Sequence, residues 1–473
     1  MIGRTGSLLL TLAIYAAAQQ SPQSIESAKQ DIVVEAFTTD VSFNDDGTSR
    51  QETTARFRIQ SDAAVQQFGV LSFPYQADCE KIEAFEIRVR KPDGTVVVTP
   101  PANAQDLAAA VARSAPTYSD AREKQIPVKA LGVGDVLEYR IVQVRTKAEA
   151  PGHFWYTDDF FKDRVVLDET LRISVPAGKY VKVSSPANKP ERREENGRVT
   201  YTWKNSLAEV PKHDENEQQP SHRPVPAIQI TTFHNWEEVG QWYARLQQTR
   251  IELTPALRAR AAELTAGLKT DTDKARALYQ FVSTKFRYIS VSLGEGRYQP
   301  HSADEVLANQ YGDCKDKHTL FAALLSAAGV DAWPVLIGAG LAFDPDLPSP
   351  AQFNHVITYL PGGGPVQWLD TTPEIAPYGY LDQVLRDQQA LLIPAGAAPK
   401  VVSTPPVLPY AAAETISMKA KLAADGTLTG HFELSARGDT EVLLRELFHS
   451  TGPVQWTPLV QKIAAAMGYG GAG

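Results

Sequence analysis

The sequence YGDCKDKHTL, residues 311–320, is the most informative stretch of this chain. Its residues predict a helix that starts at Cys314 and runs to Ala328, with Asp313 as its N-cap and Asp316 as the reciprocating partner of a capping box. A thiol in the first turn of a helix lies among unpaired backbone N–H groups, at the positive end of the helix dipole. Both favour the thiolate over the thiol, so Cys314 is a candidate nucleophile.

Two polar residues downstream could act together with this thiol. His355 lies in FNHVITYL and Asp370 ends VQWLD, two runs with a strand pattern that are separated by the turn signal at 361–364. A cysteine on a helix, with a histidine and an aspartate on neighbouring strands, supplies a nucleophile, a base and a group that orients the base. His318, one helical turn after Cys314, is the competing base. We favour His355 because Asp370 can orient its ring.

The order Cys, His, Asp, with GDCKDK at the helix start, NHV on the first strand and WLD on the second, resembles the transglutaminase-like superfamily. The resemblance extends from about Asn235 to Pro394, and the β-rich segment before it looks like the domain of unknown function that commonly precedes this domain in bacteria. It implies a papain-like α+β core in which Cys314, His355 and Asp370 are catalytic. The reaction stays open, since relatives include amide crosslinkers, proteases, deglycosylating amidases and members that have lost activity.

The expected chemistry is acyl transfer from an amide. The thiolate of Cys314 would attack the carbonyl carbon, His355 would protonate the leaving amine, and a thioester would form. An amine acceptor would then give transamidation, and water would give hydrolysis. The Cys314 backbone N–H is one candidate oxyanion donor, and Gln299, in GRYQPHS, is a second, because papain-like enzymes place a glutamine similarly. The alternative is a non-catalytic envelope protein that binds a peptide or glycan.

Composition and spacing argue against several other classes of protein. No acidic array matches a calcium-binding loop, and the DCKDKH spacing lacks further zinc ligands, so we expect no cofactor and no metal. The net charge of −8 and the absence of a Lys/Arg block disfavour nucleic acid as a partner. The expected partner is a protein or peptide substrate, and the sequence does not predict an oligomeric state.

The N-terminal stretch MIGRTGSLLLTLAIYAAAQQ has the composition of a cleaved secretory signal. Arg4 supplies a short positive region, an apolar run extends from Leu8 to Tyr15, and small residues precede Gln19. This run is too short to span a bilayer, and no later window approaches the roughly 18 apolar residues of a transmembrane helix. We therefore expect removal of residues 1–18 and a periplasmic or extracellular protein.

The sequence contains two cysteines, and we expect both to be free. Cys79 falls in a strand-like segment of a different domain from Cys314, whereas a disulfide needs Cα atoms within about 7 Å. Lys315, Asp316 and Lys317 follow Cys314, and we interpret these charges as a sign that the start of the helix is not fully buried. That interpretation favours a reactive thiol over a structural one.

The pattern of segments predicts an α+β protein in three parts. Residues 30–206 alternate like strands between hairpin turn signals, which favours an antiparallel β-sandwich. A polar, proline-rich linker is predicted at 207–232. Helix caps and then strand patterns place the transglutaminase-like α+β domain at 233–400.

The last part, 410–473, is predicted to begin a further β-rich segment. It contains a hairpin that turns at 425–426 and then two segments with a helical pattern.

Overall fold

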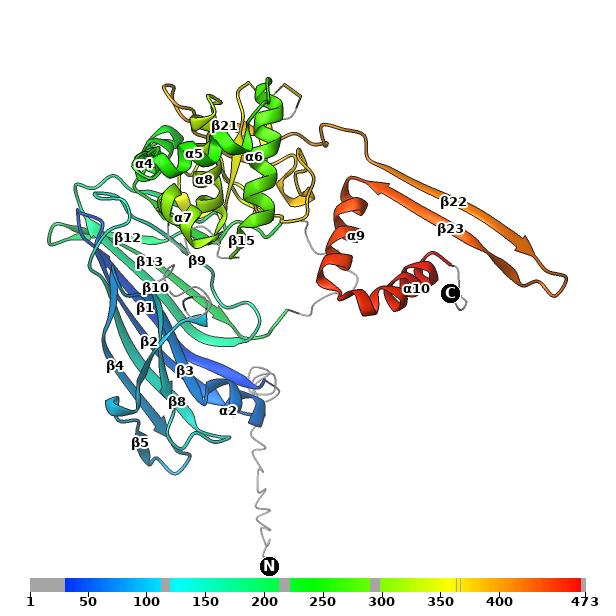
Figure 1. Ribbon diagram of the computed structural model, residues 1–473. Helices are drawn as coiled ribbons and strands as arrows, with labels where there is room; N and C mark the ends of the chain where they lie inside the picture. Colours follow the sequence, from blue (N-terminus) through cyan, green and yellow to red (C-terminus); the bar gives the residue numbers. More distant parts are fainter. Residues whose placement is uncertain are drawn as a thin grey trace, which may run out of the picture.

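The computed structural model describes residues 30–110, 112, 120–211, 222–289, 298–362, 364–365 and 367–468. The chain forms a β-rich N-terminal region, a central α+β domain, and a C-terminal hairpin followed by two helices (Figure 1). This order agrees with the predicted fold class. The predicted signal segment, 1–18, lies outside the described residues.

The N-terminal region is built on one eight-stranded sheet with the order β12-β13-β10-β1-β2-β8-β4-β5. Its strands are β1 Ile32–Phe43, β2 Ser49–Ile59, β4 Glu80–Arg90, β5 Val96–Val98, β8 Val136–Arg145, β10 Val165–Pro176, β12 Glu191–Glu195 and β13 Arg198–Leu207. The prediction of a purely antiparallel sandwich is wrong at one pair, because β1 and β10 run parallel. The long connection between these two strands allows the crossover that a parallel pair requires.

Two small sheets cover this large sheet. One has the order β3-β7-β6 and the other β11-β14-β9, and each encloses its own cluster of buried apolar side chains against the large sheet. Their strands are β3 Val70–Gln76, β6 Gln105–Ala108, β7 Ala121–Pro127, β9 Trp155–Asp158, β11 Lys182–Ser184 and β14 Ile228–Thr231; the helix α2 Asp62–Phe68 precedes β3.

Strand β14 corrects the predicted linker. All four of its residues are buried, and it pairs with both β11 and β9. The prediction of a linker over 207–232 is therefore wrong for 228–231, because the apolar IQIT sequence completes a sheet of the N-terminal region. Residues 212–221 of that segment lie outside the described residues.

The central domain starts with helices whose caps agree with the sequence pattern. The side chains of Asn235, Thr254, Thr270 and Ser302 each accept a hydrogen bond from a backbone N–H in the first turn of their helix. The helices are α4 Trp236–Gln248, α5 Pro255–Leu264, α6 Asp271–Lys285, α7 Ala303–Asn309 and α8 Cys314–Ala327. A short parallel pair, β15 Arg287–Tyr288 and β16 Tyr311–Gly312, leads into α8.

A five-stranded sheet with the order β19-β18-β17-β20-β21 completes this domain. Its strands are β17 Trp333–Ile337, β18 His355–Tyr359, β19 Trp368–Leu369, β20 Gln389–Leu392 and β21 Lys400–Ser403. All four pairings are antiparallel. Because α8 contacts β18 as well as α5, α6 and α7, it lies between the helices and the sheet.

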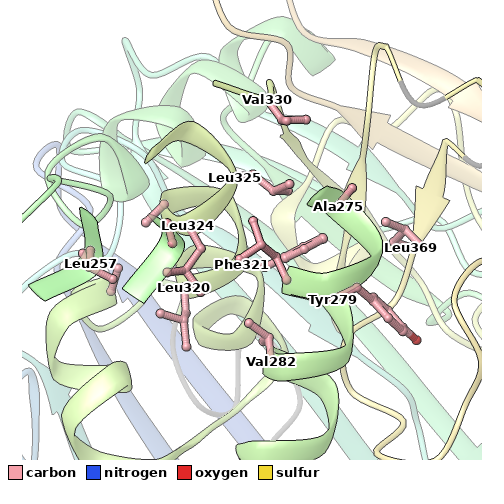
Figure 2. Close-up of a cluster of buried hydrophobic side chains, with 14 of the residues drawn as sticks. Leu257, Ala275, Tyr279, Val282, Leu320, Phe321, Leu324, Leu325, Val330 and Leu369 are labelled. Carbon is pink, nitrogen blue, oxygen red and sulfur yellow. The ribbon is translucent and has the colours of Figure 1, made fainter. Parts of the chain in front are cut away.

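The main core of the domain surrounds α8 (Figure 2). Leu320, Phe321 and Leu324 are fully buried among side chains of α5 and α6, and the ring of Tyr279 meets that of Phe321 edge to face at 6.2 Å. Burying apolar side chains of this size contributes roughly 1.5–3 kcal/mol each. This packing fixes the position of α8 and therefore of its first residue, Cys314.

The C-terminal part is a hairpin followed by two helices. Strands β22 Ala413–Leu422 and β23 Leu428–Arg437 are joined by a turn in which Gly426 has φ +87°, as expected for the predicted hairpin. Helices α9 Asp439–Ser450 and α10 Trp456–Ala466 follow, so this part is not predominantly β. Arg386 pairs with Asp439 and links α9 to the central domain.

Candidate active site

The N-terminus of α8 is held by a capping box, as predicted. The Asp313 Oδ1 atom accepts a hydrogen bond from the Asp316 N–H at 3.2 Å, and the Asp316 Oδ2 atom accepts one from the Asp313 N–H at 3.4 Å. The Lys315 ammonium pairs with the second oxygen of Asp313. Cys314, the first helical residue, is thereby fixed between two anchored neighbours.

The charged residues that follow Cys314 are buried, and our interpretation of them was wrong. Lys315, Asp316 and Lys317 are exposed by 1%, 0% and 0%. The Lys317 Nζ atom donates to the carbonyls of Ser283 and Phe286 at the end of α6, at 3.2 and 2.8 Å. Burial lowers the pKa of Lys317 to about 8 and raises that of Asp316 to about 7. These charges mark an enclosed, internally paired helix start and not a solvated one.

The structure brings His355 and Asp370 together. His355 is the first residue of β18 and Asp370 directly follows β19, its antiparallel neighbour. The Nε2 atom of His355 lies 2.9 Å from Oδ2 of Asp370. The other carboxylate oxygen, Oδ1, accepts hydrogen bonds from the backbone N–H and hydroxyl of Thr372 at 2.9 and 2.8 Å. Thr372 therefore fixes the orientation of the carboxylate that in turn fixes the ring.

Electrostatics favour a charged His355 between Asp370 and Cys314. Burial lowers the pKa of His355, but the charge and hydrogen bond of Asp370, together with a side-chain hydrogen bond from Cys314, hold this pKa well above its ordinary value. Burial raises the pKa of Asp370, yet His355 and Thr372 outweigh it and keep this pKa low. Because Asp370 occupies Nε2, the Nδ1 atom is the ring nitrogen left to interact with the sulfur.

The competing histidine, His318, belongs to the core. Its Nδ1 atom lies 2.7 Å from Oγ1 of Thr358, and burial lowers its pKa to about 3. A ring with such a pKa is neutral at physiological pH. No described residue hydrogen-bonds its Nε2 atom. His318 is thus a neutral core residue, whereas His355 is hydrogen-bonded to a carboxylate that favours its charged form.

The structure places Gln299 at the surface. With the amide oriented to suit its neighbours, the Gln299 oxygen accepts hydrogen bonds from Nε and Nη2 of Arg250 at 3.3 and 2.8 Å. This bond uses the amide oxygen, whereas an oxyanion would accept a hydrogen bond from the Nε2 group, so the role of Gln299 as an oxyanion donor stays a prediction.

The structure also points to Tyr243, on α4, which the sequence reasoning missed. Tyr243 is fully buried in the same cluster as Cys314, and among the described residues its hydroxyl has no hydrogen-bond partner. Burial raises its pKa, and the charges of Cys314 and Asp313 raise it further. Its sequence context, an apolar helix face, gives no functional signal.

The N-terminal region supplies one wall of the site through the loop 146–154. Ala150 is buried in the same cluster as Cys314, and the Trp242 indole N–H donates to the Glu149 carbonyl at 3.2 Å. The turn between β1 and β2 supports this loop, because the Gly152 N–H donates to the Asp46 carbonyl at 2.9 Å.

The packing at this turn is tight. A Cβ atom added at Gly47, which has φ +89°, would lie 2.3 Å from the carbonyl oxygen of His153. The turn therefore tolerates no larger residue without displacing the loop.

Both cysteines are free, as predicted. Within the described ranges, no three His, Cys, Asp or Glu side chains are grouped so that they could hold a metal ion. Among the helices that the structure describes, none combines the length and apolar character needed to cross a bilayer.

The chain matches two family models, in the predicted order. Residues 45–211 match a domain of unknown function with a solved structure, DUF3857, and residues 258–339 match the transglutaminase-like superfamily. The second match includes Cys314 but ends before His355 and Asp370. No curated protein matches the sequence.

The fold is shared with a solved structure. A candidate protease from Parabacteroides distasonis ATCC 8503 has a TM-score of 0.66 and 16% identity, over 80% of this chain and 72% of that chain. An M1 zinc metallopeptidase mutant from Deinococcus radiodurans, bound to a Tyr-Ser-Ala substrate, has a TM-score of 0.23 and 10% identity over 43% of each chain. The first similarity shows the fold, and the second is too weak to support an argument.

Proposed function

We propose that this protein, in which a transglutaminase-like domain follows a DUF3857 domain, is an exported thiol enzyme that acts on amide bonds of peptides or proteins. One observation carries the proposal. The Nε2 atom of His355 lies 2.9 Å from Oδ2 of Asp370, and the interaction of the same ring with Cys314, at the N-terminus of α8, helps to raise the pKa of His355. This arrangement supports the assignment of a nucleophile, a base and its orienter to residues of three elements.

The reaction begins with attack of the Cys314 sulfur on the amide carbonyl carbon. His355 carries a proton, because its pKa is held well above the ordinary value, and it donates this proton to the leaving nitrogen as the C–N bond breaks. The products of this step are a thioester on Cys314 and a free amine. A second nucleophile, an amine or water, then gives its proton to the now neutral His355 as it attacks the thioester carbon. The C–S bond breaks, which releases the acyl product and restores the thiolate beside a protonated ring.

The negative charge on the carbonyl oxygen needs hydrogen-bond donors. The backbone N–H of Cys314, at the first helical position, is one donor. We assign the Tyr243 hydroxyl as the second, because it is buried, lacks another partner among the described residues and lies within electrostatic range of Cys314.

Replacing Tyr243 with Phe tests this assignment. We expect turnover to fall by roughly 10²–10³-fold, the usual cost of losing one oxyanion donor, while the melting temperature stays equal or rises, since an unpaired buried hydroxyl is removed. Tyr378→Phe is the matched control, because its hydroxyl is also buried without a described partner but lies near Arg276. Equal turnover in both variants would show that Tyr243 only packs.

Selective labelling of the two thiols tests the proposed function itself. Both cysteines are 1% exposed, so a difference in their labelling rates would not result from a difference in solvent exposure. Burial, with Glu80, raises the pKa of Cys79 to about 11, whereas Cys314 lies beside a cationic ring. At about pH 6.5 we expect iodoacetamide to label Cys314 at least about tenfold faster, as followed by peptide mass spectrometry. Equal rates would favour the alternative, a binding protein with an unreactive thiol.

Export is proposed from the composition of residues 1–18. A mature N-terminus near Gln19 in the cell-envelope fraction would support it, and an intact Met1 in the cytosol would contradict it.

A further inference from the structure

The N-terminal region contains a cavity of about 210 Å³ beside the candidate active site. Residues of β1, β2, β4 and β8 line it on one side, and the loop 146–154 and β9 line it on the other. Pockets that bind drug-sized ligands have volumes of roughly 300–1,000 Å³. A cavity of this size therefore suits a single side chain or a small amine.

The cavity is lined by more carboxylates than cationic groups. Glu80 is fully engaged, because its Oε1 atom accepts hydrogen bonds from Nε and Nη2 of Arg145 at 3.1 and 2.7 Å, and its Oε2 atom accepts one from Gln143 at 3.2 Å. The Glu149 side chain is only 11% exposed, and its Oε1 atom lies 3.6 Å from Nη1 of Arg145. Two carboxylates thus share one guanidinium, and Glu149 has the weaker contact.

Other charged groups nearby do not supply the missing positive charge. Burial lowers the pKa of His153, so its ring is neutral at physiological pH. Lys315 acts on Glu149 only at a distance, because its ammonium is paired with Asp313. Burial accordingly raises the pKa of Glu149 to about 7. An added cation would satisfy this carboxylate.

The remaining walls are largely aromatic. Phe43 and Phe154 stack with their ring centres 4.0 Å apart, and Trp155 and Tyr156 complete the lining. Aromatic faces attract cations, and the attraction grows when the cation is removed from water. A buried carboxylate with aromatic neighbours is the combination that binds an ammonium group, which offers three donors.

The cavity adjoins the site of the proposed reaction. Trp155 lines it and also contacts the rings of Trp242 and Tyr298, at 5.6 Å each, in the cluster that includes Cys314. Ala150, next to Glu149, is buried in the same cluster. The cavity and Cys314 therefore lie against the same packed cluster of side chains.

We propose that this cavity, the ammonium pocket, binds a primary ammonium group of the peptide substrate through Glu149. A lysine side chain and a peptide N-terminus both carry this group. The role of the pocket in catalysis rests on the proposed function, but binding does not, so the two can be tested separately.

The first experiment measures binding to the full chain with Cys314→Ala, in which no thioester can form. Calorimetry at pH 8 compares Nα-acetyl-lysine methylamide with its neutral analogue, Nα-acetyl-norleucine methylamide. We expect the lysine compound to bind at least about tenfold more tightly, as for a charge-assisted contact. Alanine methylamide carries only an α-ammonium and so represents a peptide N-terminus. Selective binding of that compound would also support the pocket and would identify the N-terminus as the group that it binds. Equal binding of all three compounds would overturn the proposal.

Substitution of Glu149 locates the binding. In the same background, Glu149→Gln should abolish the preference for the ammonium, whereas Glu83→Gln, an exposed residue of β4 that does not line the cavity, should retain it. Retention of the preference in a folded Glu149→Gln variant would overturn the proposal. The comparison of the lysine and norleucine compounds uses the chain with Glu149 unchanged. It therefore still tests the proposal if the Glu149→Gln variant does not fold.

The pH dependence adds a second readout. Glu149 loses its charge as the pH falls through its pKa of about 7, so the preference for the ammonium should weaken between pH 8 and pH 6. The other titratable groups that interact with Glu149 or line the cavity beside it include Glu80, Arg145, Lys315, His153, Cys79 and Tyr298. Burial raises the pKa of Cys79 to about 11 and raises that of Tyr298 as well, so neither loses its proton over this interval. Burial lowers the pKa of His153, so its ring takes up a proton less readily than an ordinary histidine as the pH falls. A preference that is constant over this interval would contradict the assignment to Glu149.

Turnover by the chain with Cys314 intact separates the two proposals. Glu149→Gln should raise KM for lysine-containing amide substrates with little change in kcat, and leave KM for norleucine analogues unchanged. Ammonium binding without acylation of Cys314 would refute the enzyme and retain the pocket. Acylation without any ammonium preference would refute the pocket and retain the enzyme.

Discussion

Replacing His355 with Ala should reduce formation of the thioester on Cys314 by roughly 10⁴-fold or more, because the nucleophile loses both its proton acceptor and the cation that stabilises it. The measurement is the rate of acyl-enzyme formation, followed by intact-protein mass spectrometry with an amide or activated ester substrate. An ester needs no proton on its leaving group, so the loss should be smaller with the ester than with the amide.

His318→Gln is the matched control for this change. His318 lies on α8, one helical turn after Cys314, and its hydrogen bond with Thr358 places it in the core. A glutamine can still hydrogen-bond Thr358, so we expect a loss of stability of about 1–3 kcal/mol and nearly unchanged acylation. If His318→Gln abolished acylation while His355→Ala preserved it, the base would be misassigned.

Replacing Asp370 with Asn should lower turnover by roughly 10- to 10⁴-fold, where the upper value applies to a triad that depends fully on its carboxylate. Asp370 is the principal group that raises the pKa of His355 against the effect of burial. Without its charge, the imidazolium loses its proton at a lower pH. The alkaline limb of the pH–rate profile should therefore move to lower pH.

Stability provides the control for Asp370→Asn. The asparagine oxygen can still accept the two hydrogen bonds from Thr372, so the melting temperature should change little. Turnover within about twofold of wild type, with an unmoved alkaline limb, would mean that Asp370 is only a turn residue and that Cys314 and His355 act as a pair.

Local sequence patterns predicted much of what positions the site. The start of α8 at Cys314 and its capping box follow from the spacing of Asp313 and Asp316, which involves no distant residue. The proximity of His355 and Asp370 followed from two strands joined by a turn. These features depend on neighbours in the chain.

Features that depend on distant partners could not be predicted in this way. The burial of Lys317 is possible because two carbonyls at the end of α6 accept its hydrogen bonds. The hydroxyl of Tyr243 and the amide of Gln299 are defined by tertiary packing, which periodicity does not report. The parallel pairing of β1 with β10 likewise depends on the whole course of the N-terminal region.

The β1–β2 turn supports the loop 146–154, so a substitution in that turn can disturb the candidate active site. Gly47 is more than 260 residues before Cys314 in the sequence. Even so, one methyl group added at Gly47 would clash with the carbonyl oxygen of His153, which belongs to the loop beside Cys314. Inactivating mutations need not cluster in the segment that carries the cysteine. A survey of natural variants should therefore read the two domains as one functional unit.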